Sequence, residues 1–111
     1  MAASYNLKNL LVIVDRNKLI TLDKTENLIK LENLKKKFKA FNFNTSVING
    51  HNFEEIKKKL LVFKKTKNNK PSCIIANTTK GKGIKFMENN KEFHHKIPNK
   101  LEYQKALELL N

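Results

Sequence analysis

Polar residues that could bind a cation or a phosphate follow the apolar segments of the chain. Asp15 and Asn17 come directly after the apolar run 10–14, and side-chain oxygens are the ligands that Mg²⁺ prefers. Segment 78–83, Thr-Thr-Lys-Gly-Lys-Gly, holds two of the three glycines, which could bring backbone N–H groups close to a phosphate. Both patterns also fit ordinary turns, in which Asp, Asn and Gly are common. The cation site and the phosphate site are therefore hypotheses, each with a plain turn as its alternative.

The histidines and the single cysteine offer few further candidates for catalysis or metal binding. His94 or His95 could act as an acid or base near neutral pH, and a surface role is the alternative. Adjacent histidines point in different directions in an extended chain, so a joint metal site is not expected. His51 follows Gly50, whose backbone freedom suits a tight turn. The single cysteine, Cys73, excludes an internal disulfide and a cysteine-based zinc site, which favours a buried apolar role.

The apolar pattern predicts strands that alternate with helices. Strands are expected at 9–15, 45–49 and 72–77, and the first and third lack polar alternation, as strands buried on both faces do. Helices are expected at 28–41, after Asn52 and after Asn99, and each of these two asparagines has a glutamate three positions later, the spacing of a capping box. The apolar face of the second helix is expected to hold Phe53, Ile56, Leu60 and Phe63.

This order of elements predicts an α/β fold, with a parallel sheet flanked by helices. The 111 residues allow one domain or part of one. Because ligands bind beyond the carboxyl ends of the strands in such sheets, residues 15–19, 49–52 and 77–83 form the candidate binding rim.

The charge of +13 raises a second functional class, association with nucleic acid. The chain has 22 lysines and one arginine, whereas proteins that read bases or bind phosphates in a bidentate manner rely on arginine. A lysine- and asparagine-rich composition is also typical of an AT-rich coding sequence, so specific nucleic-acid binding is not favoured. No apolar run approaches the ~20 residues of a membrane span, and the first residues lack the pattern of a secretory signal, which predicts a cytoplasmic protein without a membrane segment.

Taken in order, the candidate segments resemble the thiamine diphosphate-binding domain of transketolase. Residues 7–19, 47–52, 74–83 and 86–99 carry the resemblance, and together they cover nearly the whole chain in the family's order. The block Met-Glu-Asn-Asn and then Phe-His-His-Lys-Ile-Pro-Asn is similar to that of the short bacterial transketolase subunit holding only this domain, where Trp-His-Gly-Lys-Ala-Pro-Asn stands. Deoxyxylulose phosphate synthase shares Lys-Gly-Lys-Gly but fits this block less well.

The resemblance implies a transferase that uses thiamine diphosphate to move a two-carbon ketol unit between sugar phosphates, in the pentose phosphate pathway. It implies Mg²⁺ or Ca²⁺ as the ion that bridges the cofactor diphosphate to the protein. Asn17 matches the family's asparagine ligand and Leu19 its backbone carbonyl ligand, so both are expected to bind metal and cofactor. His94 matches the active-site histidine near the diphosphate and the reacting substrate, which makes it the expected catalytic and cofactor-binding residue.

The chain also departs from the family pattern. The Gly-Asp-Gly motif that supplies a further metal ligand would precede Met1, and His95 stands where the family has glycine. Residues 1–111 are therefore expected to form a single partial domain, the C-terminal part of the cofactor domain. We expect this chain to be inactive alone, to need a complementary transketolase subunit or the missing N-terminal half, and to form oligomers through the unpaired edge of strand 10–14. A degenerate binding or scaffold module is the alternative.

Overall fold

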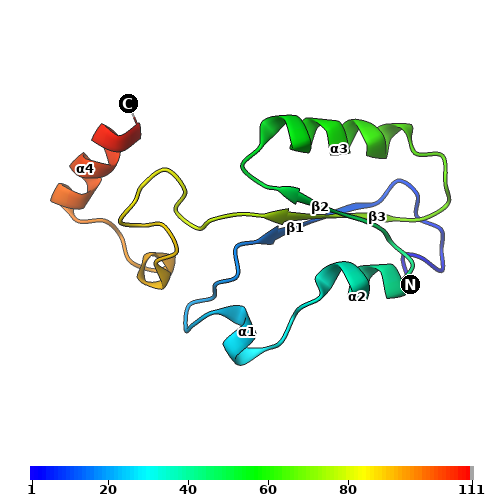
Figure 1. The fold of residues 1–111 in the computed structure, drawn as a ribbon, viewed down its shortest axis with the longest axis horizontal. Coiled ribbons are helices and arrows are strands. Elements are labelled where there is room, and N and C mark those ends of the chain that lie inside the picture. The colour runs from blue at the N-terminus through cyan, green and yellow to red at the C-terminus, as the bar shows by residue number, and fades with distance from the viewer. Residues whose placement is uncertain (111) are drawn as a thin grey trace. The chain divides into compact units, whose positions relative to one another are not determined.

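Three parallel strands form the centre of the computed structural model, which describes residues 1–110. The strands are β1 (Leu11–Arg16), β2 (Asn44–Asn49) and β3 (Ser72–Asn77), in the order β1-β3-β2 (Figure 1). Arg16 and Asn49 both pair with Asn77, so the three strands end at the same edge. The predicted parallel sheet is confirmed, with each strand within two residues of its expected bounds.

The chain divides into two compact units. Among the described residues, the first comprises 1–16 and 31–78 and holds the sheet, while the second comprises 17–30 and 79–110. In the first unit, α2 (Leu34–Ala40) and α3 (Phe53–Lys65) lie on opposite faces of the sheet (Figure 1). The second unit contains α1 (Thr25–Leu28), the 3-10 helix η1 (Lys91–His94) and α4 (Lys100–Leu110).

The core of the first unit lies on the central strand. Residues 72–76 of β3 are all buried, as the absence of polar alternation predicts. Ile48, Ile74 and Ala76 form the buried cluster, against which Leu11, Ile56 and Leu60 pack.

Strand β1 was expected to be buried on both faces, and this expectation is wrong for Ile13, which is 58% exposed. The reason is the strand order. β1 lies at an edge of the sheet, while α2 and α3 make their main contacts with β2 and β3. An apolar strand at an edge exposes both a side-chain face and unpaired backbone groups.

The helix expected at 28–41 is also wrong as a single element. The structure has α1, a non-helical segment and then α2, which starts after Asn33. The side chain of Asn33 accepts a hydrogen bond from Lys36 N at 3.1 Å and so caps α2, which makes this asparagine a helix start rather than a helix interior. Spacing of leucines alone could not reveal this break.

Helix α3 begins at the predicted cap. Asn52 Oδ1 accepts hydrogen bonds from Glu54 N and Glu55 N at 3.0 and 3.1 Å, while the Glu55 carboxylate reaches Asn49 N at 2.9 Å rather than the backbone of the cap. Phe53 is 84% exposed, so it does not join the expected apolar face. As the first helical residue, its side chain tilts toward the helix N-terminus, beyond the residues that pack on the sheet.

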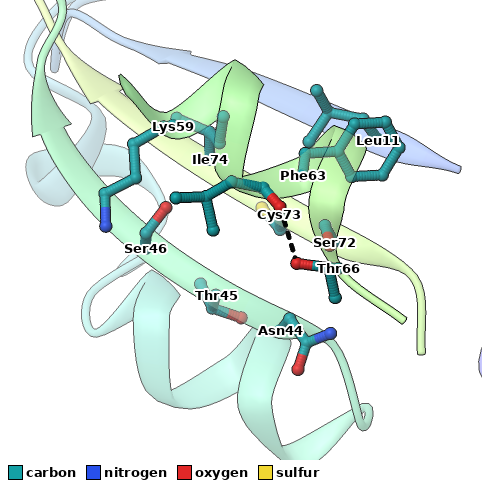
Figure 2. A pocket seen from close by; sticks show the side chains of 11 residues that line it. Leu11, Asn44, Thr45, Ser46, Lys59, Phe63, Thr66, Ser72, Cys73 and Ile74 are labelled. Atoms are coloured by element: carbon teal, nitrogen blue, oxygen red, sulfur yellow. Dashed lines mark hydrogen bonds between the residues drawn. The ribbon is translucent and has the colours of Figure 1, made fainter. Parts of the chain in front are cut away.

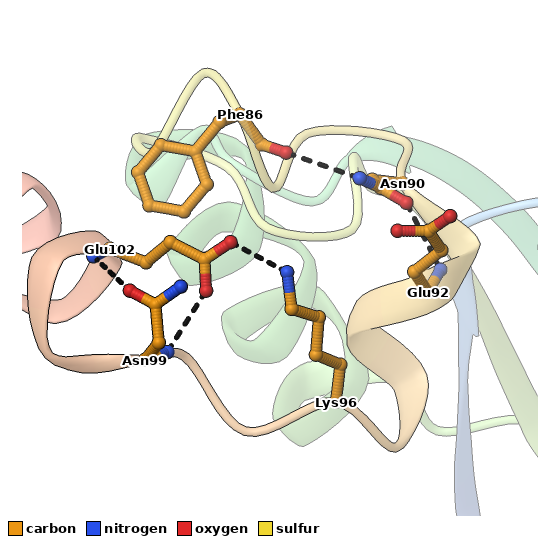
Figure 3. A network of polar contacts seen from close by, with 6 residues as sticks. All are labelled: Phe86, Asn90, Glu92, Lys96, Asn99 and Glu102. Atoms are coloured by element: carbon orange, nitrogen blue, oxygen red, sulfur yellow. Dashed lines mark hydrogen bonds and ion pairs between the residues drawn. The ribbon is translucent and has the colours of Figure 1, made fainter.

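Helix α4 shows the reciprocal capping box that the sequence predicts. Glu102 N donates to Asn99 Oδ1 and Asn99 N donates to the Glu102 carboxylate, both at 2.9 Å (Figure 3). Of its expected apolar side only Ala106 is buried, while Tyr103, Leu107 and Leu110 are exposed. No helix among residues 1–110 is both long and apolar enough to cross a membrane.

Candidate functional site

The loop after β1 holds the two residues expected to bind a cation. Asn17 Oδ1 accepts a hydrogen bond from the backbone N–H of Leu19 at 2.9 Å. Between them, Lys18 adopts a left-handed backbone with φ of +64°, which reverses the chain. The structure therefore brings Asn17 and Leu19 together through a local turn in the second unit.

A short antiparallel bridge fixes the orientation of Leu19. Leu19 pairs with Lys24, flanked by hydrogen bonds from Thr25 N to Lys18 O at 3.0 Å and from Ile20 N to Asp23 O at 2.9 Å. In such a non-hydrogen-bonded pair, the N–H and C=O of each residue point away from the partner strand. The Leu19 carbonyl therefore points to the side on which its N–H meets Asn17 Oδ1.

Two oxygens on one edge suit a hard cation. An amide oxygen has two lone pairs, so Asn17 Oδ1 can accept the Leu19 N–H and still bind an ion. Mg²⁺ and Ca²⁺ take six or more oxygen ligands, so further ligands must come from elsewhere. Among residues 1–110, no three His, Cys, Asp or Glu side chains gather into a metal site. The donor chemistry of Asn17 and Leu19 fits the expected cation, and their role as ligands stays a prediction.

Leu19 also lines a hollow of about 380 Å³ within the second unit. Asp23 and Lys24 line it from the same loop, and residues 89–92 line it from the segment that leads into η1. Lys91 Nζ donates to Leu22 O at 2.8 Å, which ties this segment to the loop. The pKa of Asp23 is lowered, chiefly because the Asn27 side chain donates a hydrogen bond to its carboxylate at 2.8 Å, and next because the backbone N–H of Lys24 does so. The loop after β1 and the start of η1 thus form one surface.

His94 is the last residue of η1 and is exposed. It is not among the residues that line the hollow, whereas Glu92, two positions earlier, is. The neighbouring Phe93 packs against Phe86 with ring centroids 5.8 Å apart. The structure therefore places His94 on the same element as the hollow, without bringing its ring into the lining.

The two adjacent histidines do not point in different directions, as an extended chain would require. Their rings meet edge to face with centroids 4.7 Å apart, because η1 ends here in a helical turn rather than an extended strand. The next residue, Lys96, pairs with Glu102 at 2.6 Å (Figure 3). Its ammonium group also lies over the Phe93 ring, 4.8 Å from the centroid. These contacts hold the segment around His94 against the start of α4.

The glycine-rich segment is a turn closed by the side chain of Glu88, five residues after Gly83. Gly81 and Gly83 have φ of +73° and +99°, and a Cβ on Gly81 would lie 2.5 Å from Met87 O. Gly83 N donates to Glu88 Oε1 at 3.1 Å, and Lys82 pairs with the same oxygen at 3.6 Å. The Glu88 carboxylate thus accepts the hydrogen bond from Gly83 N that would otherwise be available to a phosphate.

A smaller hollow of about 120 Å³ lies in the first unit, between α3 and the sheet (Figure 2). Asn44 and Ser72 line it, and these residues are the first of β2 and β3. It therefore lies at the amino ends of the strands, opposite the candidate binding rim. The Thr66 hydroxyl, which also lines it, donates to Val62 O at 2.7 Å and is occupied within the helix end (Figure 2). This hollow reflects the packing of α3 on the sheet and adds no residue to the candidate site.

The strand tips of the first unit are joined by contacts that the sequence did not indicate. The Thr78 hydroxyl donates to the Asp15 carboxylate, so Asp15 joins the tips of β1 and β3. Gly50 N donates to Asn77 O at 2.7 Å, and a Cβ on Gly50 would lie 2.5 Å from Thr78 Cγ2. Gly50 lacks a left-handed φ, so the expectation of an unusual backbone is wrong, and close packing explains the glycine.

Arg16 is another residue whose role the sequence did not reveal. It is 4% exposed, and its Nε and Nη2 each lie 3.0 Å from Glu32 Oε1. Nothing in the sequence indicated that this polar residue, at the end of an apolar strand, would be buried. Its partner Glu32 lies 16 positions away, so local spacing could not identify the pair.

Comparison with known proteins gives one consistent result. Residues 1–105 match the family model described as transketolase, thiamine diphosphate binding domain. A subunit of the apulose-4-phosphate transketolase of Phocaeicola vulgatus is 36% identical over 103 residues, which are 93% of this chain and 36% of that protein. The protein of the same name from Actinobacillus succinogenes is 39% identical over 109 residues, 98% of this chain and 39% of that protein.

Solved structures agree with the sequence comparison. The transketolase of Campylobacter jejuni has a TM-score of 0.85 and 35% identity, over 96% of this chain and 16% of that chain. A Pichia stipitis transketolase in complex with sedoheptulose 7-phosphate, at 20% identity and a TM-score of 0.67 over 98% of this chain and 19% of that chain, supports the fold. The chain spans less than two fifths of the two apulose-4-phosphate transketolase subunits that it matches.

Proposed function

The chain belongs to the family of the transketolase thiamine diphosphate-binding domain, and from that premise we propose that it forms part of the cofactor site of a ketol-transferring enzyme. The observation that carries the proposal is the turn after β1, where Asn17 Oδ1 and the backbone of Leu19 lie on one edge. When bound, thiamine diphosphate supplies the electron sink for cleaving and forming the carbon–carbon bond of the sugar. The substrates are sugar phosphates, the class named in the apulose-4-phosphate transketolase relatives.

In this proposal Asn17 and the Leu19 carbonyl hold the Mg²⁺ or Ca²⁺ ion that neutralises the cofactor diphosphate. The hydrogen bond from Leu19 N orients the asparagine oxygen, so the side-chain rotamer is already fixed before the ion binds. The ion also needs a ligand from the Gly-Asp-Gly motif, which this sequence lacks. The chain therefore supplies two of the ligands, and the others come from elsewhere.

His94 is the proposed catalytic residue. Its imidazole is exposed on η1, within two residues of the hollow that Leu19 lines. An imidazole can pass a proton to or from a sugar hydroxyl near neutral pH. His95 lies against it edge to face, which restricts the ring more than the glycine of the family pattern would.

A second polypeptide completes the enzyme in this proposal. Relatives named as single subunits of a transketolase imply a partner subunit, and the chain covers only 36% and 39% of two of them. The exposed edge of β1, with Ile13 at its surface, is the proposed attachment point for the missing strands or for another copy in an oligomer. A cytoplasmic location and a role in the pentose phosphate pathway are part of the same proposal, because cells make and use sugar phosphates internally.

Two measurements test the proposal. The purified chain should show no ketol transfer from xylulose 5-phosphate to ribose 5-phosphate above a cofactor blank, because one part of a domain cannot exclude water or hold both ends of the cofactor. When it is coexpressed with a transketolase segment carrying Gly-Asp-Gly and with the pyrimidine-binding domain, the complex should bind Ca²⁺ and thiamine diphosphate by calorimetry. Asn17→Ala should weaken this binding at least tenfold, whereas Asn27→Ala in helix α1 of the same unit should not. Equal affinity for the Asn17→Ala complex would refute the cation site.

Nucleic-acid association is the weaker candidate. The charge of +13 favours it, but the single arginine is buried and paired with Glu32, which leaves lysines as the exposed cations. Lysine side chains give non-specific binding that falls steeply with salt. Retention of duplex or single-stranded DNA by the chain at about 0.15 M salt would support this function, and release at that ionic strength would dismiss it.

A further inference from the structure

Helix α3 carries exposed aliphatic residues that do not join the core of the first unit. Ile56 and Leu60 pack against the core of the first unit. Leu61 and Val62 are 46% and 51% exposed. Val62 lies at the side of the helix, where it also lines the hollow between α3 and the sheet. Successive residues of a helix are about 100° apart, so Leu61 cannot turn toward the sheet without removing Ile56 and Leu60 from it.

The exposed aliphatic pair lies in a basic hollow. A hollow of about 260 Å³ runs along this side of α3, and its lining residues recur three or four positions apart, as one face of a helix requires. We call it the outer α3 face: Glu54, Lys57, Lys58, Leu61, Val62 and Lys65. Two aliphatic side chains therefore lie among three ammonium groups over about 12 Å of helix, at about 1.5 Å per residue.

This pattern differs from a solvated helix face. Scattered exposed apolar residues are normal, but two neighbouring ones in a hollow with a polar rim are typical of an interaction surface. Each lysine can lay its methylene chain beside the aliphatic pair while its ammonium group stays in water. A partner with aliphatic groups at its centre and carboxylates at its sides would match both features.

The charges identify the class of partner. A second copy of the chain would bring another +13 and another row of lysines to the interface, so self-association through this face is opposed by charge. Nucleic acid presents phosphates but no aliphatic side chains for Leu61 and Val62. Because the face runs along a straight helix, a second helix can lie beside it with its own apolar stripe in register.

We propose that the outer α3 face binds an acidic amphipathic helix of another polypeptide. Leu61 and Val62 contact the apolar stripe of that helix, and Lys57, Lys58 and Lys65 pair with carboxylates on either side of it. The proposal is independent of the cofactor site, because α3 lies in the first unit and Asn17, Leu19 and His94 lie in the second.

A synthetic helix tests this directly. The probe is a fluorescent peptide of about 18 residues with leucines at every third or fourth position and glutamates on both sides of them, titrated with the full chain at about 0.15 M NaCl. Leu61→Ser/Val62→Ser should weaken binding at least tenfold, and Lys57→Glu/Lys58→Glu should do the same. The matched control, Lys36→Glu/Lys39→Glu on α2, makes the same change of charge at exposed positions and should alter affinity less than twofold. Circular dichroism checks that each variant folds.

The alternatives give distinct results. Equal binding of a scrambled peptide of the same composition would show a charge effect alone and would overturn the proposal. Tighter binding to phosphatidylglycerol vesicles, lost in Leu61→Ser/Val62→Ser, would overturn it by assigning the face to a membrane surface. A dimer on a sizing column that the same variant dissociates would overturn it in favour of a second copy. In the expected result, the backbone amide signals that shift with peptide belong to residues 54–65.

Discussion

Gly50→Ala should destabilise the first unit by crowding the strand tips. The new Cβ would lie 2.5 Å from Thr78 Cγ2, 3.1 Å from Asn77 O and 3.2 Å from Ala76 Cβ. Thr78 cannot rotate this methyl group away without withdrawing its hydroxyl from Asp15. Overpacking of this kind costs about 1–3 kcal/mol, so we expect a loss of about 2 kcal/mol in the free energy of unfolding.

Thr78→Ser provides the matched second change. Serine keeps the hydroxyl that donates to Asp15 and removes the methyl group that the new Cβ at position 50 would meet, so the double variant should recover about 1 kcal/mol relative to Gly50→Ala. The recovery is partial because Asn77 O and Ala76 Cβ stay close. Urea denaturation followed by circular dichroism measures the parent, both single variants and the double variant, with similar m-values as the test of a common unfolded state. If Gly50→Ala is as stable as the parent, or if Thr78→Ser fails to rescue it, the packing explanation is wrong.

Three further changes test other parts of the structure. Lys18→Gly should raise the free energy of unfolding by about 0.5–1 kcal/mol, because glycine relieves the left-handed backbone, and Lys18→Ala should not, since it keeps the Cβ; urea titration distinguishes them. Ile74→Ala should cost about 2–5 kcal/mol as a buried core truncation, whereas Ile13→Ala at the exposed edge should cost much less, so equal losses would contradict the assigned core. Burial raises the pKa of the Cys73 thiol from 9.0 to about 11. Because the unfolded thiol then loses its proton first, this group contributes stability below about pH 9 that is lost as pH rises toward about 11. Cys73→Ala should remove that part of the alkaline decline in denaturation midpoints, and an unchanged pH profile would oppose the assignment.

The sequence predicted best those features that local chemistry determines. Strands β1 and β3 follow from consecutive apolar residues, and β2 follows from a short β-branched segment. The caps at Asn52 and Asn99 follow from an asparagine with a glutamate three positions later. The proximity of Asn17 to Leu19 is also local, because a side chain two residues back closes the turn. Such features need no knowledge of the rest of the chain.

The features that sequence patterns missed depend on which segments meet. Ile13 and Ile75 are the same kind of residue in similar runs, yet one lies on an edge strand and the other on the central strand. Strand order is set by the connections and helices of the whole domain, so the exposure of Ile13 could not be read from its neighbours. The role of Gly50 was missed for the same reason, since its constraint is the side chain of Thr78, 28 positions away.

The ion pair between Arg16 and Glu32 joins the two points at which the chain leaves and re-enters the sheet-bearing unit. The intervening residues 17–30 therefore begin and end beside this ion pair, as an inserted loop begins and ends at neighbouring points of a domain. Replacement or shortening of residues 17–30 should leave the strands intact as long as the ion pair between Arg16 and Glu32 is kept. We therefore expect mutations of Asn17 and Leu19, the proposed cation ligands, to leave the sheet folded, so that loss of the proposed cation site and loss of structure are separable events.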